Sequence, residues 1–407
     1  MAVGPETVPA VVHSVPGVRI GVVEAGIRKK NRRDLVVFGF APGTALAATF
    51  TRNQFCAAPV TVAKEHLAAA PAGVRYLLIN TGCANAGTGA PGLADARTSC
   101  AALAQLAGVP AAAVLPFSTG VIGERLPVDR LVAALPQALG ALGAESWLDA
   151  AHGIMTTDTR PKVASVQVAI DGRPVVITGI SKGAGMICPN MATMLAFVAT
   201  DAVVAPADLQ HWLSAATERS FNRITIDGDT STNDACVLAA TGASGVAIPA
   251  SGPQADIFRR ALDALMLQLA QAIVRDGEGA TKFIEVQVEG GRDTAECLAV
   301  AYTIAHSPLV KTALFASDPN WGRILACVGR AGLPALDVSR VDIHLGDVCI
   351  VKNGGVAPDY TEARGAAVMQ REDIVIRVSL ARGDARDCLW TTDLSFDYVK
   401  INAEYRT

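Results

Sequence analysis

Segments with strand and helix patterns alternate irregularly along the chain, and this order constrains the fold more than any other feature of the sequence. Runs rich in Val, Ile and aromatic residues predict strands at 35–40, 76–80, 163–170, 175–180, 282–289, 341–345 and 374–380. Apolar residues at helical spacing predict helices at 93–106, 128–142, 207–220 and 255–274. Several strand pairs are joined by short turns, as at Asp171-Gly172, which is typical of hairpins. Hairpins interleaved with helices favour a layered α/β sandwich over a doubly wound parallel sheet.

The composition is typical of a protein with a large core and a small-molecule partner. Of the 407 residues, 51% are hydrophobic and only 18% are charged, which suits two or three domain-sized units. The formal net charge of -3 leaves no basic surplus to neutralise phosphates. We therefore expect no nucleic-acid partner and no anionic membrane surface as a partner.

The start of the chain and its cysteines suggest an intracellular protein. The first residues lack the basic and apolar regions of a secretory signal, and no window reaches about 18 uninterrupted apolar residues. The nine cysteines are scattered without a CxxC pair, and the sequence contains no HExxH motif. We expect a cytoplasmic protein with reduced thiols and no bound metal.

A glycine- and proline-rich stretch between Lys182 and Leu195, KGAGMICPNMATML, has the most unusual local sequence. It runs directly into an apolar, strand-like segment. A threonine at such a junction becomes a nucleophile if a base lies beside it, and its own α-amine is that base once the preceding peptide bond is cut. The bond between Ala192 and Thr193 is therefore a candidate cleavage site. The alternative interpretation is an ordinary glycine-rich turn before a strand.

Two further loops carry glycines beside hydroxyl or amide groups. The loop at 116–123, PFSTGVIG, can direct a backbone N–H and a side-chain hydroxyl at one point, as a tetrahedral oxyanion requires. A plain connection between a strand and a helix is the competing interpretation. The loop at 80–89 can offer backbone amides to polar substrate atoms or a phosphate, although it lacks the GK[ST] ending of a P-loop.

Three more polar loops, at 221–234, 275–282 and 317–323, separate apolar segments. The first contains three aspartates, but the EF-hand spacing and its closing glutamate are missing, so calcium binding is not predicted. Taken singly, each of these loops is explained as a turn.

Taken together and in this order, the motifs resemble the ornithine acetyltransferase family, also called bifunctional glutamate N-acetyltransferase. The similarity covers nearly the whole chain, and seven ordered motifs are more specific than any one of them. They are STGVIG at 118–123, TTDT at 156–159, KGAGMICPNMATML at 182–195, FNRITIDGDTSTND at 221–234, GEGATK at 277–282, SDPNWGR at 317–323 and the C-terminal residues 398–407.

The resemblance implies an enzyme of arginine biosynthesis that moves an acetyl group from N-acetylornithine to glutamate. Members of the family cut themselves at the bond that corresponds to Ala192-Thr193, which implies an α chain of residues 1–192 and a β chain of residues 193–407. The Oγ of Thr193 then takes the acetyl group as an ester and passes it to glutamate in a ping-pong cycle. By the same resemblance, the Thr119 hydroxyl and the Gly120 backbone N–H form the oxyanion hole.

The resemblance also implies the residues that bind the substrates. Lys182 offers a cation for an α-carboxylate, and Glu278 offers an anion for an ammonium group. The full set carried over is Thr156, Thr157, Lys182, Thr193, Glu278, Asn402 and Thr407.

The fold, assembly and second activity of the family complete the expectation. The resemblance implies helices outside and β-sheets inside, as in enzymes with an N-terminal nucleophile, and an assembly of at least α2β2. We expect no resident cofactor, with acetyl-CoA as a co-substrate that also acetylates glutamate. The alternatives are a transferase without the acetyl-CoA activity, an aminopeptidase-like hydrolase with water as acceptor, and an uncleaved metabolite-binding or scaffolding protein.

Overall fold

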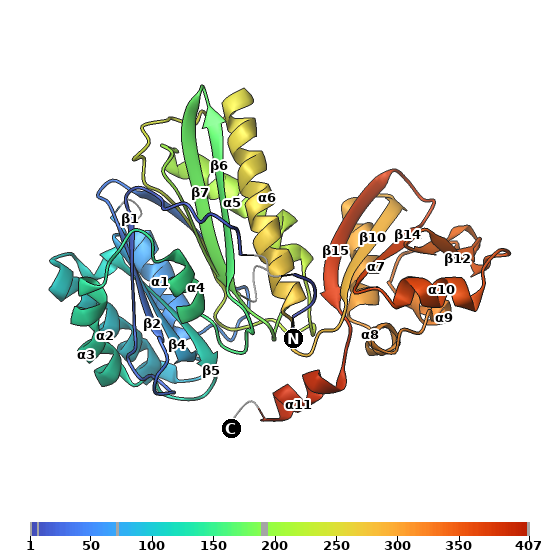
Figure 1. The fold of residues 1–407 in the computed structure, drawn as a ribbon, viewed down its shortest axis with the longest axis horizontal. Helices are drawn as coiled ribbons and strands as arrows, with labels where there is room; N and C mark the ends of the chain where they lie inside the picture. The colour runs from blue at the N-terminus through green and yellow to red at the C-terminus, as the bar shows by residue number, and fades with distance from the viewer. Residues whose placement is uncertain (1, 6–7, 71–72, 189–193, 405–407) are drawn as a thin grey trace. The chain divides into compact units, whose positions relative to one another are not determined.

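The computed structural model describes residues 2–5, 8–70, 73–188 and 194–404. The chain divides into two compact units (Figure 1). The large unit comprises residues 6–222 and 229–273, and the small unit comprises residues 1–5, 223–228 and 274–407. The candidate cleavage residues Ala192 and Thr193, and the C-terminal Thr407, lie outside the described residues.

The large unit contains two β-sheets. The first has the strand order β1-β2-β4-β5, formed by Val18–Val23, Leu35–Phe40, Tyr76–Cys83 and Val114–Val121. The second has the order β3-β9-β8-β7-β6, formed by Ala45–Phe50, Ala235–Ala240, Leu195–Thr200, Arg173–Lys182 and Lys162–Ile170. Both sheets are mixed, because β4 pairs in parallel with β5 and β8 pairs in parallel with β9.

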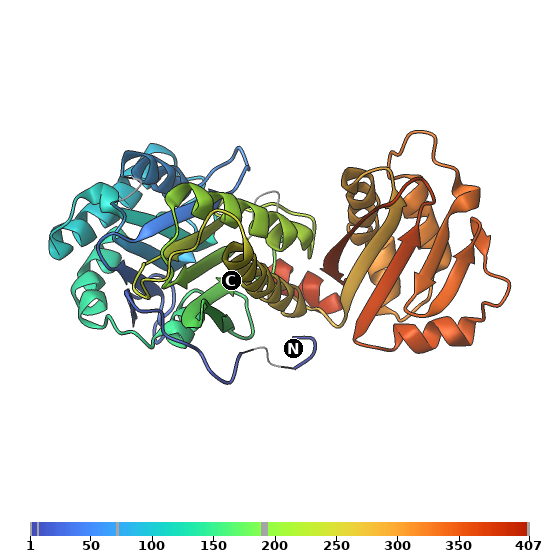
Figure 2. The same ribbon diagram turned by 90° about the horizontal axis from the view of Figure 1, so that it is seen from above.

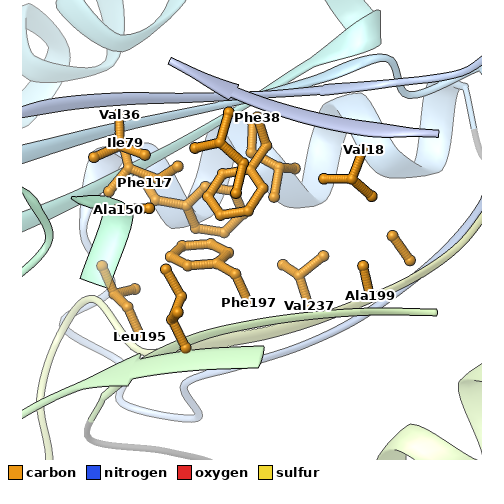
Figure 3. Packing of buried hydrophobic residues seen from close by; sticks show 14 of the residues in the cluster. Val18, Val36, Phe38, Ile79, Phe117, Ala150, Leu195, Phe197, Ala199 and Val237 are labelled. Carbon is orange, nitrogen blue, oxygen red and sulfur yellow. The ribbon is translucent and has the colours of Figure 1, made fainter. Parts of the chain in front are cut away.

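The main hydrophobic core fills the space between these two sheets (Figure 3). The Phe197 ring on β8 packs against Phe38 on β2 and Phe117 on β5, with ring centroids 5.5 and 5.2 Å apart. All six residues of β2, LVVFGF, are buried because the other face of its sheet is covered as well. A continuous apolar run is what a strand covered on both faces requires.

Helices cover the outer faces of both sheets. Residues of α2 and α3 form a second apolar cluster with β2 and β4, and α5 and α6 lie against the five-stranded sheet (Figure 1). The Gln210 side chain of α5 accepts from Ala48 N–H and donates to Ala48 O, both at 3.2 Å. The helices of this unit are α1 Ala58–Ala69, α2 Gly89–Ala107, α3 Val128–Gly140, α4 Trp147–Gly153, α5 Pro206–Arg219 and α6 Pro253–Arg275. Short 3-10 turns occur at Ala111–Ala113 and Phe221–Arg223.

The small unit is one twisted six-stranded sheet with helices packed against it (Figure 2). Its order is β13-β12-β11-β14-β10-β15, formed by Gly355–Val356, Val348–Lys352, Asp342–Leu345, Asp373–Ser379, Phe283–Gly291 and Ala385–Thr392. Its helices are α7 Thr294–Ala305, α8 Pro308–Phe315, α9 Trp321–Gly329, α10 Glu362–Met369 and α11 Phe396–Glu404, with a 3-10 turn at Val338–Arg340. Buried residues of α7, α8 and α9 form a third core with the sheet.

The predicted layered α/β architecture is confirmed, and so is every predicted strand and helix, with ends that differ by a few residues. The hairpin turn is confirmed too, since Asp171 and Gly172 have φ of 50° and 74°, as a type I′ turn requires. The prediction of a loop at 116–123 was wrong for most of its length. Residues up to Val121 belong to β5, where parallel pairing with the distant β4 outweighs the local glycine signal.

Within the described ranges, no single helix is long and apolar enough to cross a membrane. The bent pair α7 and α8 reaches that length and hydropathy only when the two helices are taken together.

Candidate active site

Lys182 brings two predicted site residues together at one end of the large unit's sheets. Its Nζ donates to Thr119 Oγ1 at 3.2 Å and to Thr156 Oγ1 at 2.9 Å. Lys182 is the last residue of β7 and Thr119 lies near the end of β5, so two separate sheets supply this contact. Because the ammonium supplies the hydrogen in the bond to Thr119, the Thr119 hydroxyl keeps its own hydrogen for another acceptor.

Gly120, the other predicted oxyanion residue, occupies a position that only glycine fits. Its φ is 134°, and a Cβ built on it would lie 2.3 Å from the carbonyl carbon of Gly82. Gly82 and Gly120 face each other in the parallel pairing of β4 with β5, next to a register irregularity at Cys83. The close approach of the two strands therefore fixes the backbone that carries the Gly120 N–H.

A buried carboxylate holds the TTDT loop against the end of β7. Asp158 Oδ1 accepts from Lys162 Nζ and from Gly183 N–H, both at 2.7 Å, and Oδ2 accepts from Thr156 N–H at 2.9 Å. The Asp158 side chain thus fixes the backbone of Thr156 and of Gly183, the residue after Lys182, and so helps to position both partners of the Lys182–Thr156 hydrogen bond. Sequence reasoning noted the TTDT motif but gave no role to its aspartate.

The charge of Asp158 is stable in this setting. Burial alone would raise its pKa, but the ammonium groups of Lys162 and Lys182 and the hydrogen bonds that it accepts hold its pKa well below the ordinary value. The carboxylate therefore remains an anion beside two buried cations.

A second buried carboxyl, Asp234, lies near the same group and was not singled out by sequence reasoning. It ends the motif at 221–234 and directly precedes β9. Burial raises its pKa well above the ordinary value, although a hydrogen bond from Ser231, the charge of Lys182 and the backbone of Met194 act in the opposite direction. Its burial depends on the pairing of β9 with β8, which the local sequence does not reveal.

Asparagine side chains form hydrogen bonds that link the ends of β4 and β5. Asn233 Nδ2 donates to the carbonyl oxygens of Ala84 and Ser118 at 2.6 and 2.9 Å, and Ser118 Oγ donates to Asn80 Oδ1 at 2.6 Å. The prediction of a loop at 80–89 was too long, because residues 80–83 belong to β4 and α2 begins at Gly89; in the loop that remains, Asn85 Oδ1 accepts from Thr88 Oγ1. The polar side chains of this loop therefore bind the protein's own backbone and side chains.

The small unit brings together two other predicted residues that are 124 positions apart. Asn402 Nδ2 on α11 donates to Glu278 Oε2 at 2.8 Å, and only 9% of Glu278 is exposed. The backbone next to Glu278 also packs closely against α11, because a Cβ built on Gly279 would lie only 2.4 Å from Tyr398 N. The contact between the GEGATK loop and the C-terminal helix thus fixes Glu278.

The described site residues therefore fall into two groups. Thr119, Thr156 and Lys182 are joined in the large unit, with Thr157 half-buried next to Thr156, while Glu278 and Asn402 are joined in the small unit. Among the residues that the structure describes, no group of three or more His, Cys, Asp or Glu side chains is arranged to hold a metal ion.

Two facing sheets between helices, with a buried lysine and threonine hydroxyls at the ends of their strands, define a layered α/β enzyme. The chain belongs to the ArgJ family, whose family model matches residues 19–407. The resemblance drawn from the seven motifs is thereby confirmed.

Proteins similar to this chain carry the same family name. A protein of Pseudomonas syringae pv. tomato named arginine biosynthesis bifunctional protein ArgJ is 57% identical over 409 residues and covers 100% of both chains. A protein of that name from Methylococcus capsulatus is 59% identical and covers 97% of this chain and 96% of its own. A solved structure of the Bacillus halodurans protein of that name is 41% identical, with a TM-score of 0.50, and covers 52% of this chain and 99% of the solved chain.

Proposed function

We propose that this protein is a bifunctional acetyltransferase of arginine biosynthesis that works in the cytoplasm. In one reaction it moves the acetyl group of N-acetylornithine to glutamate, and in the other it acetylates glutamate from acetyl-CoA. The observation that carries the proposal is the full-length similarity to proteins named bifunctional ArgJ, together with the contact of Lys182 with Thr119 and Thr156. Family membership favours this transferase over the aminopeptidase-like alternative.

The nucleophile in this proposal is Thr193, made available by cleavage of the Ala192-Thr193 bond. Cleavage would leave residues 1–192 as an α chain and residues 193–407, slightly more than half of the protein, as a β chain. The solved Bacillus halodurans chain matches over 99% of its length but covers only 52% of this chain, which is the extent expected of one such fragment. The mature particle would then be at least α2β2.

The chemistry follows the geometry around Thr119 and Gly120. Attack of the Thr193 Oγ on the acetyl carbonyl creates an oxyanion, which the Thr119 hydroxyl and the Gly120 N–H would stabilise. The Lys182 ammonium polarises the Thr119 hydroxyl through their hydrogen bond, which strengthens it as a donor. Ornithine leaves, and the amine of glutamate then attacks the acetyl ester.

Substrate recognition requires groups of both charges. Lys182 would pair with an α-carboxylate, and Glu278, whose neighbour Asn402 is neutral, would pair with an ammonium group. Thr156, Thr157 and the C-terminal Thr407 would complete the contacts with the polar ends of the substrates.

The first test is the intact mass of the denatured protein. Wild-type protein should give two fragments that end and begin at residues 192 and 193, and Thr193→Ala should remain one chain. Thr193→Ser keeps a hydroxyl nucleophile and should still be cut. Thr200→Ala changes a buried threonine at the far end of β8 and serves as the control, which should be cut like the wild type. A single uncut wild-type chain would exclude the mechanism.

The second test is acetyl transfer by the cleaved protein. N-acetylornithine without glutamate should release ornithine in an amount stoichiometric with enzyme, because the acetyl group stays on the threonine. Release that depends strictly on glutamate would contradict the ping-pong order. Acetylation of glutamate from acetyl-CoA separates the bifunctional enzyme from the monofunctional alternative.

A further inference from the structure

Glu278, the proposed partner of a substrate ammonium group, lies in a tight turn of the small unit. Ala280 N–H donates to Gly277 O at 2.9 Å, and Gly279 has a φ of 68°. A positive φ at the third position of such a turn favours glycine. Glu278 is therefore presented at the corner of a four-residue turn.

Both glycines of this turn press against one segment, residues 392–398, which joins β15 to α11. A Cβ built on Gly277 would lie 2.9 Å from Thr392 Cγ2, and one built on Gly279 would lie 2.6 Å from Ser395 Oγ. Each position thus has room for a hydrogen atom but not for a side chain. The turn that carries Glu278 rests directly on the segment 392–398.

Asp393 connects this segment to the chain that follows the turn. Its Oδ1 accepts from the backbone N–H groups of Thr281 and Lys282 at 2.8 and 2.9 Å, and its Oδ2 accepts from the Thr281 hydroxyl at 2.6 Å. Only 4% of Asp393 is exposed. Hydrogen bonds to a carboxylate are stronger than those to a neutral acceptor, and buried N–H groups that lose their acceptor are costly. Asp393 therefore fixes the backbone three residues after Glu278.

Helix α8 fixes the position of Asp393 in turn. The Lys311 ammonium group donates to Thr391 Oγ1 at 3.1 Å and to Thr392 O, and Leu394 N–H donates to Lys311 O at 3.2 Å. Burial lowers the pKa of Lys311 to about 8, and the negative charge of Asp393 acts in the opposite direction. The residues on both sides of Asp393 are therefore bound to Lys311, and the two charges attract each other.

A second contact links the turn to α11. Ser395 Oγ donates to Gly279 O at 2.6 Å and accepts from Tyr398 N–H at 3.3 Å. One hydroxyl thus caps the first turn of α11 and holds the turn of Glu278. The same helix carries Asn402, which donates to the Glu278 carboxylate.

The position of Glu278 matters because of the chemistry of the proposed substrate. The α-nitrogen of N-acetylornithine is acetylated, so its only ammonium group lies at the end of its side chain. A carboxylate binds such a group well only when the two meet at about 3 Å. A site that is rigid before binding loses less entropy when the substrate arrives. Rigid support of the turn should therefore increase the affinity for this ammonium group.

We propose that Asp393 is a positioning residue, which holds the turn of Glu278 in place and so sets the preference of the enzyme for a substrate with a terminal ammonium group. The inference rests on the proposed function, in which Glu278 binds that group. Asp393 acts through Glu278 and takes no part in bond making.

The main test is the kinetics of Asp393→Ala in the mature enzyme. The substitution removes the acceptor of three hydrogen bonds, so it should raise KM for N-acetylornithine about tenfold and change kcat by less than about threefold. Asp393→Asn keeps Oδ1 for both backbone N–H groups and can donate to the Thr281 hydroxyl. Its KM should stay within about threefold of the wild type.

The matched control is Asp342→Ala. Asp342 is another carboxylate of the small unit that accepts from a backbone N–H, that of Asn353 at 2.9 Å. It pairs with Ser379 at the end of β14, whereas Phe283, which follows the Glu278 loop, pairs with the first residue of β14. The control thus removes a similar contact at the opposite end of the sheet and should leave KM unchanged.

A comparison of two ligands separates positioning from general damage. Norvaline has the carbon skeleton of ornithine without the terminal ammonium group, and calorimetry gives the dissociation constant of each. Asp393→Ala should weaken ornithine binding about tenfold and norvaline binding by less than about twofold, because only ornithine offers its terminal group to Glu278. Equal weakening of both ligands would overturn the proposal.

A double-mutant cycle tests whether Asp393 acts through Glu278. In a Glu278→Gln enzyme, which lacks the carboxylate, Asp393→Ala should weaken ornithine binding by less than about twofold further. The full tenfold effect in that background would show that Asp393 acts by another route, and the proposal would be wrong.

Thr281→Val gives a measurement that does not depend on the folding of Asp393→Ala. It removes only the hydrogen bond to Asp393 Oδ2, so it should weaken ornithine binding about threefold and leave norvaline binding unchanged. Unchanged ornithine binding would reject the role of this contact. A wild-type protein without acetyl transfer would reject the proposed function, whereas normal transfer and ornithine binding in Asp393→Ala would reject only the role of Asp393.

Discussion

The buried ion pair between Asp158 and Lys162 gives a prediction about stability that can be worked out in detail. Their side chains are 0% and 1% exposed, and Lys162 Nζ lies 2.7 Å from Asp158 Oδ1. Asp158→Asn leaves the Lys162 ammonium in the interior without this opposite charge. Removal of one partner of a buried pair costs about 3–5 kcal/mol. Because folded proteins are stable by about 5–15 kcal/mol, this loss should lower the unfolding midpoint strongly.

A second substitution should restore much of the lost stability. The double variant Asp158→Asn with Lys162→Met removes both charges and keeps a side chain of similar length, so we expect it to regain at least about half of the loss. The free energy of unfolding would be measured by urea denaturation, with Thr193→Ala in every chain so that none is cut. The control is Asp149→Asn, which breaks an ion pair with Arg33 whose side chains are each 55% exposed. It should change stability by less than about 1 kcal/mol.

The pH dependence of the same variants has a definite sign. The pKa of Asp158 is lower in the folded protein than in the unfolded chain, where it is about 3.9. The stabilisation is therefore complete above that value and is lost as the pH falls below it, because the unfolded chain takes up the proton first. The difference between parent and Asp158→Asn should persist down to about pH 4 and then shrink. A difference below about 1 kcal/mol at neutral pH would refute the reasoning.

Three further predictions concern the site. Gly120→Ala would place a Cβ 2.3 Å from Gly82 at a φ of 134°. In denaturation and activity assays it should cost on the order of 3 kcal/mol of stability and abolish acetyl transfer. The control Gly140→Ala, with no atom within 4 Å of its Cβ, should do neither. Lys182→Met should lower kcat by at least about 100-fold, because it removes the polarising contact with Thr119. It should also raise KM for the amino-acid substrates, because it removes a cation that binds them. Unchanged steady-state kinetics would contradict both roles. A tag fused after Thr407 should raise KM relative to an N-terminal tag, and equal values would remove the C-terminal residue from the substrate site.

Local sequence patterns were sufficient for much of the fold. The apolar run of β2 and the helical spacing of α6 are properties of neighbouring residues, and so is the turn at Asp171-Gly172. The ordered motifs likewise identified the family, since each keeps its chemistry-bearing residues within a few positions of one another. Lys182, Thr119 and Thr156 could therefore be named from sequence alone.

Tertiary structure decided the environment of those residues. The segment at 116–123 looked like a loop because Gly120 breaks the local pattern, yet most of it is a strand, since β4 lies alongside it. The contact between Glu278 and Asn402 joins residues 124 positions apart. Asp158 and Asp234 are ordinary acids in sequence, and only their folded surroundings separate them: neighbouring ammonium groups and hydrogen bonds lower the pKa of Asp158, whereas burial raises the pKa of Asp234. Burial and opposing charge are set by segments distant along the chain, so no local pattern can contain them.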